Sequence, residues 1–143
     1  MLHVIQTLDD PLVRLVADDP VRPEIPLEFR VGPTSEIFVL LDGDDVGAAV
    51  CCAYRDAVPA TVTELSLVSD SARVAVFYTI WSYRPGAGRK LILAAREWIQ
   101  QNRPHISEFV TLSPPTEMAR VFHIRNGAAV LRVNGDTVNY IYP

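Results

Sequence analysis

The order of elements in this chain is set by residues 73–104, which read RVAVFYTIWSYRPGAGRKLILAAREWIQQNRP. Residues 73–81 are an almost continuous run of β-branched and aromatic residues, which is typical of a strand buried on both faces in the middle of a sheet. Apolar residues then recur at helical spacing over residues 91–99, and Pro104 ends that pattern. A short segment of small residues, 84–88, separates the two patterns. The stretch therefore predicts a strand, a tight loop and a helix.

Downstream of this helix the sequence predicts one more strand, a second helix and a hairpin. Residues 108–112 are apolar enough for a strand, and Ser113–Pro114 suits a helix start with proline at the first helical position. Gly127 suits the left-handed residue that follows a helix end. Asn134–Gly135 is a strong hairpin signature. The strands that flank it are residues 128–133 and 137–142.

Upstream of residue 73 the pattern is less regular. Residues 3–7 suit a first strand, and Asp9–Asp10–Pro11 suits the start of a short amphipathic helix. Four prolines interrupt residues 19–33, so we expect a mobile connector with at most a short helix over residues 24–30. Residues 61–68 alternate only in part and suit either a strand or an irregular segment. A hairpin turning at Asp42–Gly43 is expected between strands 36–41 and 46–54.

These elements define a fold class. Hairpins are antiparallel, and the strand–helix–strand unit of residues 73–112 requires a right-handed parallel crossover. The sequence therefore predicts an α/β (mixed α+β) fold with a mixed, mostly antiparallel sheet of about six to seven strands and about four helices. A length of 143 residues, 49% of them hydrophobic and 21% charged, fits one domain over residues 1–143.

Composition also excludes several classes of function. No apolar run reaches the roughly 18 residues of a membrane span, and the N-terminus lacks the pattern of a signal peptide, so we expect a cytoplasmic protein without membrane contact. The net charge of −4 argues against nucleic-acid binding. The two cysteines, Cys51 and Cys52, are adjacent in an apolar stretch and suit buried structural thiols.

The charge is unevenly distributed along the chain. Residues 1–71 carry thirteen acidic residues against four arginines, whereas residues 72–143 carry nine basic residues against four acidic ones. The two halves therefore have net charges of −9 and +5. Lys90, the only lysine, lies in the basic half.

The basic half contains a candidate anion-binding loop. Small residues at Gly86 and Gly88 let the backbone approach a ligand, and the helix that follows presents unpaired N–H groups and a positive dipole end. Arg84, Arg89 and Lys90 add cations there. We interpret the loop as a cradle for phosphate or pyrophosphate. The alternative is that the two glycines only turn the chain and the basic residues are solvated.

Two common phosphate loops do not fit this segment. A Walker A loop requires a lysine and a hydroxyl residue directly after its last glycine, whereas Gly88 is followed by Arg89, Lys90 and Leu91. A dinucleotide-binding fingerprint requires a third glycine where Leu91 stands, and it follows the first strand of its domain.

The element order and this loop together resemble the GCN5-related N-acetyltransferase (GNAT) family, and the resemblance covers essentially the whole chain. The family's loop signature, Q/R-x-x-G-x-G/A, lies between the fourth strand and the third helix. Gly86 and Gly88 match its two small positions, Tyr83 stands at its first position, and Arg84 comes one place late.

A second part of the resemblance lies in residues 116–128, which follow the family's C-terminal helix pattern through Ala119, Phe122 and the pair Gly127–Ala128. His123 stands where the family has a tyrosine, and Thr116 stands where it has an asparagine.

The resemblance implies a V-shaped opening between strands 73–81 and 107–112 that holds acetyl-coenzyme A, or another acyl-coenzyme A, as co-substrate without a metal. It further implies direct attack of an amine on the thioester, with the amine entering from the opposite face. The 42–45 turn and the rest of the acidic half would flank that acceptor side and attract a cationic amine. The coenzyme-binding residues that it implies are Ile80, Trp81, Ser82, Tyr83, Arg84, Gly86, Ala87, Gly88, Arg89, Lys90 and Thr116.

The candidates for proton transfer are donors for the leaving thiolate and a base for the amine. An imidazolium at His123 could protonate the thiolate near neutral pH, and Tyr78 and Tyr83 are further candidate donors. Glu64 is the candidate base by its place in the expected sheet, with Glu108 or a chain of waters as alternatives. His3 and His105 lack the spacing of metal ligands.

The departures from the family pattern leave other functions open. A GNAT-like fold could serve as a protein-binding effector that acts on a partner enzyme with weak or no acetyltransferase activity, and a phosphate sensor could use the same loop. The sequence leaves the acceptor open among small amines, peptide N-termini and lysine side chains. Both a monomer and a homodimer are compatible with it.

Overall fold

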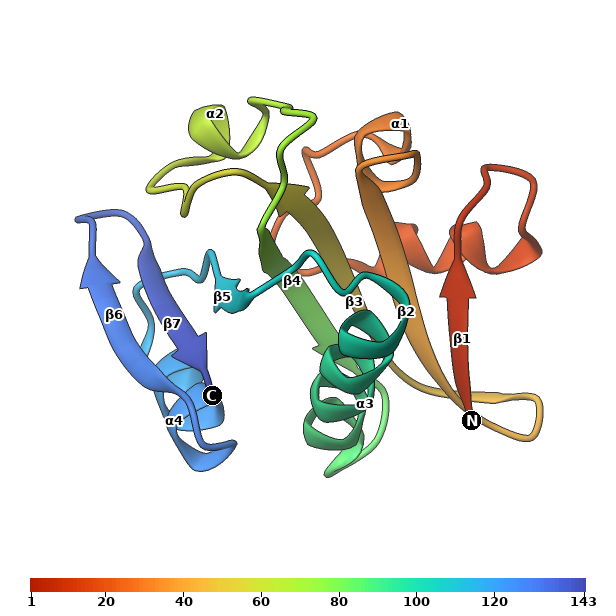
Figure 1. The fold of residues 1–143 in the computed structure, drawn as a ribbon. Helices are drawn as coiled ribbons and strands as arrows, with labels where there is room; N and C mark the ends of the chain where they lie inside the picture. The colour runs from red at the N-terminus through yellow and green to blue at the C-terminus, as the bar shows by residue number, and fades with distance from the viewer.

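The computed structural model describes all of residues 1–143 and contains one seven-stranded sheet (Figure 1). The strands are β1 (Leu2–Ile5), β2 (Ser35–Asp42), β3 (Asp45–Arg55), β4 (Val74–Ser82), β5 (Glu108–Thr111), β6 (Ala129–Val133) and β7 (Val138–Tyr142). The helices are the 3₁₀ helix η1 (Pro11–Asp18) and the α-helices α1 (Leu27–Arg30), α2 (Val62–Leu65), α3 (Ala87–Asn102) and α4 (Glu117–Arg125).

The strand order is β1-β2-β3-β4-β5-β7-β6. All neighbouring pairs are antiparallel except β4 and β5, which α3 connects as a parallel crossover. The predicted mixed, mostly antiparallel fold is therefore confirmed. Both predicted hairpins form, with Gly43 and Gly135 in the left-handed region that their turns require.

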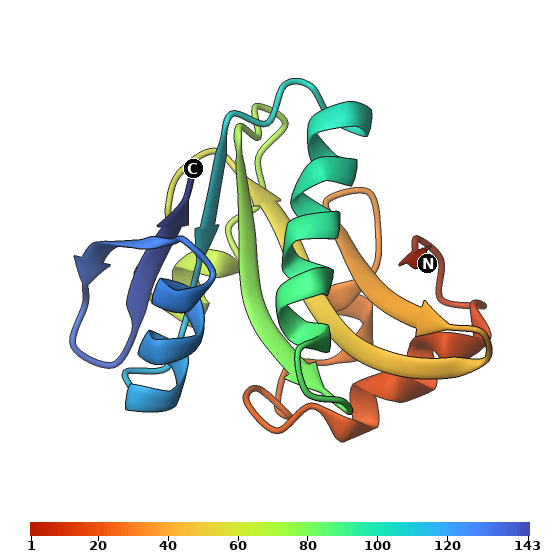
Figure 2. The same cartoon turned by 90° about the horizontal axis from the view of Figure 1, so that it is seen from below.

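Two apolar clusters cover the two faces of the sheet. One packs α3 against β2, β3, β4 and the tyrosines of β7, and the other packs η1, α1 and α2 against the opposite face. Figure 2 shows α3 lying across the sheet, with η1 on the other side. None of the helices combines the length and apolar character needed to cross a bilayer.

Two local predictions are wrong. Residues 62–65 form the short helix α2 and not a strand, because the Thr61 hydroxyl accepts a hydrogen bond from the Glu64 N–H and caps a helical turn. Helix α4 begins after Thr116, which accepts from the Ala119 N–H, and not after Ser113. Ser113 instead exchanges two backbone hydrogen bonds with Val138 and extends the β5–β7 pairing.

The expected mobile connector, residues 19–33, is a fixed part of the structure. Asp19 and Arg30 form an ion pair of 2.6 Å, and both side chains are fully buried. Arg30 also donates to the carbonyls of Arg22 and Ile25. The four prolines do limit regular helix to α1, but buried arginine hydrogen bonds hold the segment where local sequence predicts freedom.

Candidate functional site

The two parallel strands β4 and β5 pair over only four residues and then part. Their register runs from Val74 opposite Glu108 to Phe77 opposite Thr111. The Leu112 N–H donates to the Phe77 carbonyl at 3.0 Å, and β4 then continues to Ser82 paired with β3 alone. Figure 2 shows the two strands separating towards the end of β4 at which α3 begins. The expected splay therefore exists.

A bulge in β4 lies at the point where the strands part. Cys51 of β3 pairs with Thr79, and the next residue, Cys52, pairs with Phe77, so Tyr78 is the extra residue. As a result, the side chains of Tyr78 and Thr79 both lie on the face of the sheet that η1 covers. Tyr78 belongs to the apolar cluster on that face, and the Thr79 hydroxyl donates to Asp19 at 2.8 Å.

Beyond the bulge, β4 pairs with β3 on one side only. Its other edge, which we call the free edge, has no strand beside it because β5 has diverged. The Tyr83 N–H donates to the Gly47 carbonyl of β3. Because successive N–H groups of a strand point to alternate sides, those of Ile80 and Ser82 point to the open side. The free edge therefore offers backbone donors that lead from the bulge to the start of α3.

Helix α3 begins without a side-chain cap. Gly86 is its N-cap residue, with a φ of 78°, and no side chain bonds to the first turn. The N–H groups of Gly88 and Arg89 have no acceptor in the chain. Arg89 is exposed and forms no ion pair. Unpaired N–H groups, the helix dipole and a free guanidinium together favour an anion.

The residues at the start of α3 face two different neighbours, α4 and β3. The sequence did not indicate which residue faces which neighbour. A Cβ at Gly88 would lie 3.1 Å from the Phe122 ring of α4, whereas a Cβ at Gly47 would lie 3.2 Å from Ala87. Gly88 therefore faces α4 and the splay, and Ala87 faces β3. This division decides where the neighbouring cations lie.

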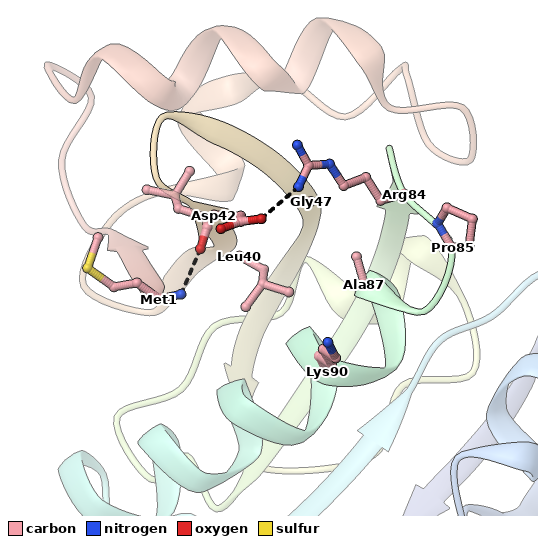
Figure 3. A pocket seen from close by; sticks show the side chains of 9 residues that line it. Met1, Leu40, Asp42, Gly47, Arg84, Pro85, Ala87 and Lys90 are labelled. Atoms are coloured by element: carbon pink, nitrogen blue, oxygen red, sulfur yellow. Dashed lines mark hydrogen bonds and ion pairs between the residues drawn. The ribbon is translucent and has the colours of Figure 1, made fainter.

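Arg84 and Lys90 lie on the β3 side, with Ala87 and not with Gly88. Arg84 donates to Asp42 at 3.0 Å (Figure 3), and it also donates to Asp45 at 2.9 Å, so its charge is engaged by the β2–β3 turn. Arg84, Asp42 and Lys90 line a cavity of about 360 Å³ beside α3. Arg84 thus ties the 42–45 turn to the β4–α3 loop, and the expectation that this turn flanks the acceptor side stays a prediction.

Tyr83 and Trp81 turn to the opposite face of the sheet. The Trp81 indole donates to the Tyr83 hydroxyl at 2.9 Å, and that hydroxyl donates to Asp18 at 2.7 Å. The residue at the first motif position thus connects the end of β4 to η1. Thr116, which the family resemblance placed near the coenzyme, has its hydroxyl engaged in capping α4.

Two of the candidate proton-transfer residues, Tyr78 and Glu64, do not present their side chains to the open side of β4. The Tyr78 side chain is buried on the η1 face, and burial raises the pKa of its hydroxyl well above the ordinary value. Glu64 is exposed on α2, accepts from the Ala60 N–H and lines a cavity of about 190 Å³. Figure 1 shows α2 at the end of the sheet where β4 begins, opposite the start of α3. The geometry supports neither residue as an acid or base at the splay.

His123 lies on α4 behind Phe122, in a buried chain of hydrogen bonds. Its Nδ1 is 2.7 Å from the Tyr142 hydroxyl and its Nε2 is 3.2 Å from the Ser113 hydroxyl, which donates to Thr111. Burial lowers the pKa of His123 to about 4. The imidazole is therefore neutral at neutral pH, and the expected imidazolium donor is not available there.

Arg22 is the residue of this region that sequence reasoning missed. Its Nε donates to the Tyr78 carbonyl and its Nη2 to the Leu112 carbonyl, both at 3.0 Å. One side chain thus bridges β4 and β5 at the point where their ladder ends. The only local signal was an arginine between Pro20 and Pro23, which does not identify a partner.

The parted parallel strands, the bulge and the uncapped helix after β4 give this chain the fold of the GCN5-related N-acetyltransferases, and solved structures show this likeness over almost its whole length. No family model matches the sequence, and no curated protein matches it. The likeness is thus one of fold.

Among the similar structures is malonyl-CoA decarboxylase from Agrobacterium vitis, with a TM-score of 0.83 and 19% identity over 99% of this chain. The present chain spans only 60% of that protein. GCN5 from Tetrahymena has a TM-score of 0.65 and 14% identity, covering 100% of this chain and 97% of its own. A Bacillus subtilis acetyltransferase in complex with CoA has a TM-score of 0.66 and 12% identity, covering 99% and 96%.

Proposed function

We propose that this protein is an acyl-CoA-dependent N-acyltransferase that moves an acetyl group, or a related acyl group, to an amine. The observation that carries the proposal is the free edge of β4, which leads from the bulge at Tyr78 to the uncapped start of α3. This arrangement matches a long ligand with an amide-bearing arm at one end and a pyrophosphate at the other.

The residues present fit such a ligand. The N–H groups of Ile80 and Ser82 would bind the amide-bearing arm, and those of Gly88 and Arg89 would bind the pyrophosphate, since no atom of the chain uses the helix donors. The Arg89 side chain would add a charge-assisted hydrogen bond. Arg84 would not bind the pyrophosphate, because its guanidinium is paired with Asp42 and Asp45.

The chemistry would be a direct transfer. The neutral amine attacks the thioester carbon, a C–N bond forms, the C–S bond breaks, and the thiolate takes a proton while the product nitrogen loses one. The protein contributes by holding the two reactants together, which is a large part of catalysis in bimolecular reactions. His123 would contribute as a neutral group between two hydroxyls and not as an acid.

Calorimetric titration with coenzyme A and acetyl-CoA tests the proposal, with Arg89→Gln and Arg84→Gln as a matched pair. Both substitutions remove one exposed cation from the same loop. We expect Arg89→Gln to weaken binding about tenfold, as the loss of a charge-assisted hydrogen bond does. We expect Arg84→Gln to change the affinity less than about twofold.

Absence of binding by either coenzyme would overturn the acyltransferase proposal. It would favour the alternative of a GNAT-fold protein that binds a partner enzyme. Equal losses from the two substitutions would show that Arg84 leaves Asp42 and Asp45 when the coenzyme binds. The cytoplasmic location and the absence of a metal remain predictions.

Decarboxylation of a malonyl-type thioester is a second candidate function. The observation that favours it is the TM-score of 0.83 with malonyl-CoA decarboxylase, against 0.65 with GCN5. The reaction would break the bond between the α-carbon and the carboxylate, release carbon dioxide and place a proton on that carbon. Mass spectrometry of malonyl-CoA incubated without an amine separates the two activities, because only a decarboxylase forms acetyl-CoA there.

A further inference from the structure

Arg22 is a buried arginine that lacks an acidic partner. Its exposed fraction is 9%, and no ion pair of the structure includes it. The nearby carboxylate of Asp19 is engaged by Arg30, and Glu24 is exposed and acts on Arg22 only at a distance. Arginines that lose most of their hydration are usually paired with an anion or use all their donors. Arg22 does neither.

The unused donors of Arg22 form one edge of its guanidinium. Nε and Nη2 each donate one hydrogen to the two strand carbonyls. Nη1 has no acceptor in the chain, and it is not among the side-chain atoms that are sealed from solvent without a partner. The two hydrogens of Nη1 and the second hydrogen of Nη2 are therefore available, and this end of a guanidinium matches the two oxygens of a carboxylate.

The backbone of Arg22 is held in place from both sides. Its N–H donates to Asp19 at 3.1 Å, and its carbonyl accepts from Arg30 at 2.7 Å. Asp19 is also bonded to Thr79 of β4, next to the bulge. The guanidinium is thus fixed before any ligand arrives, and fixed donors bind with a smaller entropy cost than mobile ones.

We propose that the unused N–H donors of Arg22, on Nη1 and Nη2, bind a carboxylate group of the substrate at the point where β4 and β5 part. The inference rests on the proposed function for the place of the thioester, and it narrows the substrates to those that carry a carboxylate near the reacting carbon. That carboxylate belongs either to the acyl group, as in a dicarboxylic acyl-CoA, or to the acceptor, as in an amino acid.

Paired ligands that differ only in this carboxylate distinguish the two sources. Malonyl-CoA is compared with acetyl-CoA, and L-alanine is compared with L-alaninamide on protein saturated with coenzyme A. We expect the carboxylate member of one pair to bind about tenfold tighter, and the pair that responds identifies the source. Binding of coenzyme A with no preference in either pair would overturn this inference and leave the proposed function intact.

A measurement without coenzyme keeps the two proposals separate. The Nε–H of Arg22 is bonded to a buried carbonyl, so its signal is observable by nitrogen-15 NMR, and Arg22→Lys assigns it. We expect malonate to shift this signal and malonamide to leave it in place. If malonate shifts it although coenzyme A does not bind, the carboxylate site stands and the acyltransferase proposal fails. If malonate leaves it unmoved, the carboxylate site is wrong.

Variants then test whether Arg22 itself binds the carboxylate. Arg22→Gln should abolish the preference within the responding ligand pair. Arg22→Lys keeps the charge but loses the paired N–H donors of the guanidinium, and it should retain part of the preference. Arg14→Gln removes a charge from the exposed surface of η1 and is the matched control, with an unchanged preference. Because the preference is a ratio measured in one folded protein, a variant of lower stability still gives a valid answer. A preference unchanged in Arg22→Gln would overturn the assignment.

Discussion

His123 occupies a chain of hydroxyl groups that runs from β7 to β5. Ser113 donates to Thr111, so the Ser113 oxygen accepts from the Nε2–H of His123, and Nδ1 accepts from the Tyr142 hydroxyl. Every nitrogen of the ring is satisfied in the neutral state. A proton added to Nδ1 would break the hydrogen bond from Tyr142 and would place a charge inside the apolar cluster of α3.

The stability of the protein should therefore depend on His123 in mildly acidic solution. Burial lowers its pKa from 6.5 to about 4, so the unfolded chain binds the proton more readily than the folded one. Its contribution is complete above pH 6.5 and is lost as the pH falls towards 4. The full difference is about 3 kcal/mol. Urea unfolding at pH 7.5 and pH 5 should show about half of this loss.

His123→Gln is the control for this prediction, because glutamine keeps hydrogen-bonding groups and does not titrate. The variant should be less stable at pH 7.5, with a smaller loss between pH 7.5 and pH 5. A His123 signal that titrates near pH 6.5 in the folded protein would contradict the assignment of a neutral ring and would restore the imidazolium as a candidate acid.

At the scale of elements, the contact between α3 and α4 depends on one missing side chain. Gly88 lies in the first turn of α3, where the sequence indicated only a loop glycine, and the space of its side chain is taken by Phe122. The sequence showed the pattern of small residues in this loop. It did not show whether Ala87 or Gly88 faces α4, because that depends on how the two helices cross.

A double-mutant cycle measures this contact. Gly88→Ala should be about 1 kcal/mol less favourable beside Phe122 than in the Phe122→Ala background, since the added methyl group lies 3.1 Å from the ring. Gly32→Ala, where a Cβ meets nothing within 4 Å, is the matched control and should show no coupling to residue 122. Additive effects of Gly88→Ala and Phe122→Ala on the urea midpoint would show that the two helices do not touch there.

The segment of residues 19–30 is held by charge and not by apolar burial alone. Burial by itself would raise the pKa of Asp19, but hydrogen bonds from Arg30, two backbone N–H groups and Thr79 hold it below its ordinary value. Composition predicted mobility here, because the prolines prevent regular backbone hydrogen bonds. Side-chain donors supply the bonds instead, and their partners are distant in sequence.

Asp19→Asn tests this account of the segment. It should cost about 3 kcal/mol, because Arg30 is left buried without a counter-ion. Hydrogen exchange should become faster over residues 19–30. The amides of β2 should slow or quicken only as much as the change in the global free energy of unfolding requires. Glu28→Gln, an exposed change in the same segment, should have little effect. Unchanged exchange in Asp19→Asn would mean that the apolar contacts of Ile25 suffice.

Across the whole molecule, the two oppositely charged halves are joined by ion pairs. Arg84 reaches the β2–β3 turn, and Arg103 at the end of α3 reaches Glu36 at 2.9 Å. The expected division into a basic coenzyme side and an acidic acceptor side stays a prediction. Part of the acidic half is neutralised internally, and the group that faces the vertex of the splay is the cation Arg22.

Glu36 is the buried anchor of this charge pairing, so its loss should weaken the whole fold. Burial alone would raise its pKa, but donors from Arg103, Tyr54 and Gln6 hold it below the ordinary value. Its contribution is present above the unfolded pKa of 4.5 and is lost as the pH falls below it. Glu36→Gln should cost about 3 kcal/mol at pH 7 and less at pH 3, as measured by chemical unfolding. An equal cost at both values would contradict a charged Glu36.

The sequence by itself determined the order of the elements other than α2, both hairpins, the parallel crossover and the glycine loop before α3. These features follow from periodicity and turn chemistry, which act between residues close in the chain. Only the tertiary structure decided which side each loop residue faces, the neutral state of His123 and the bridge made by Arg22. Arg22 binds carbonyls 56 and 90 residues further along the chain, and such partners are fixed by packing across the sheet, on which a local pattern carries no information.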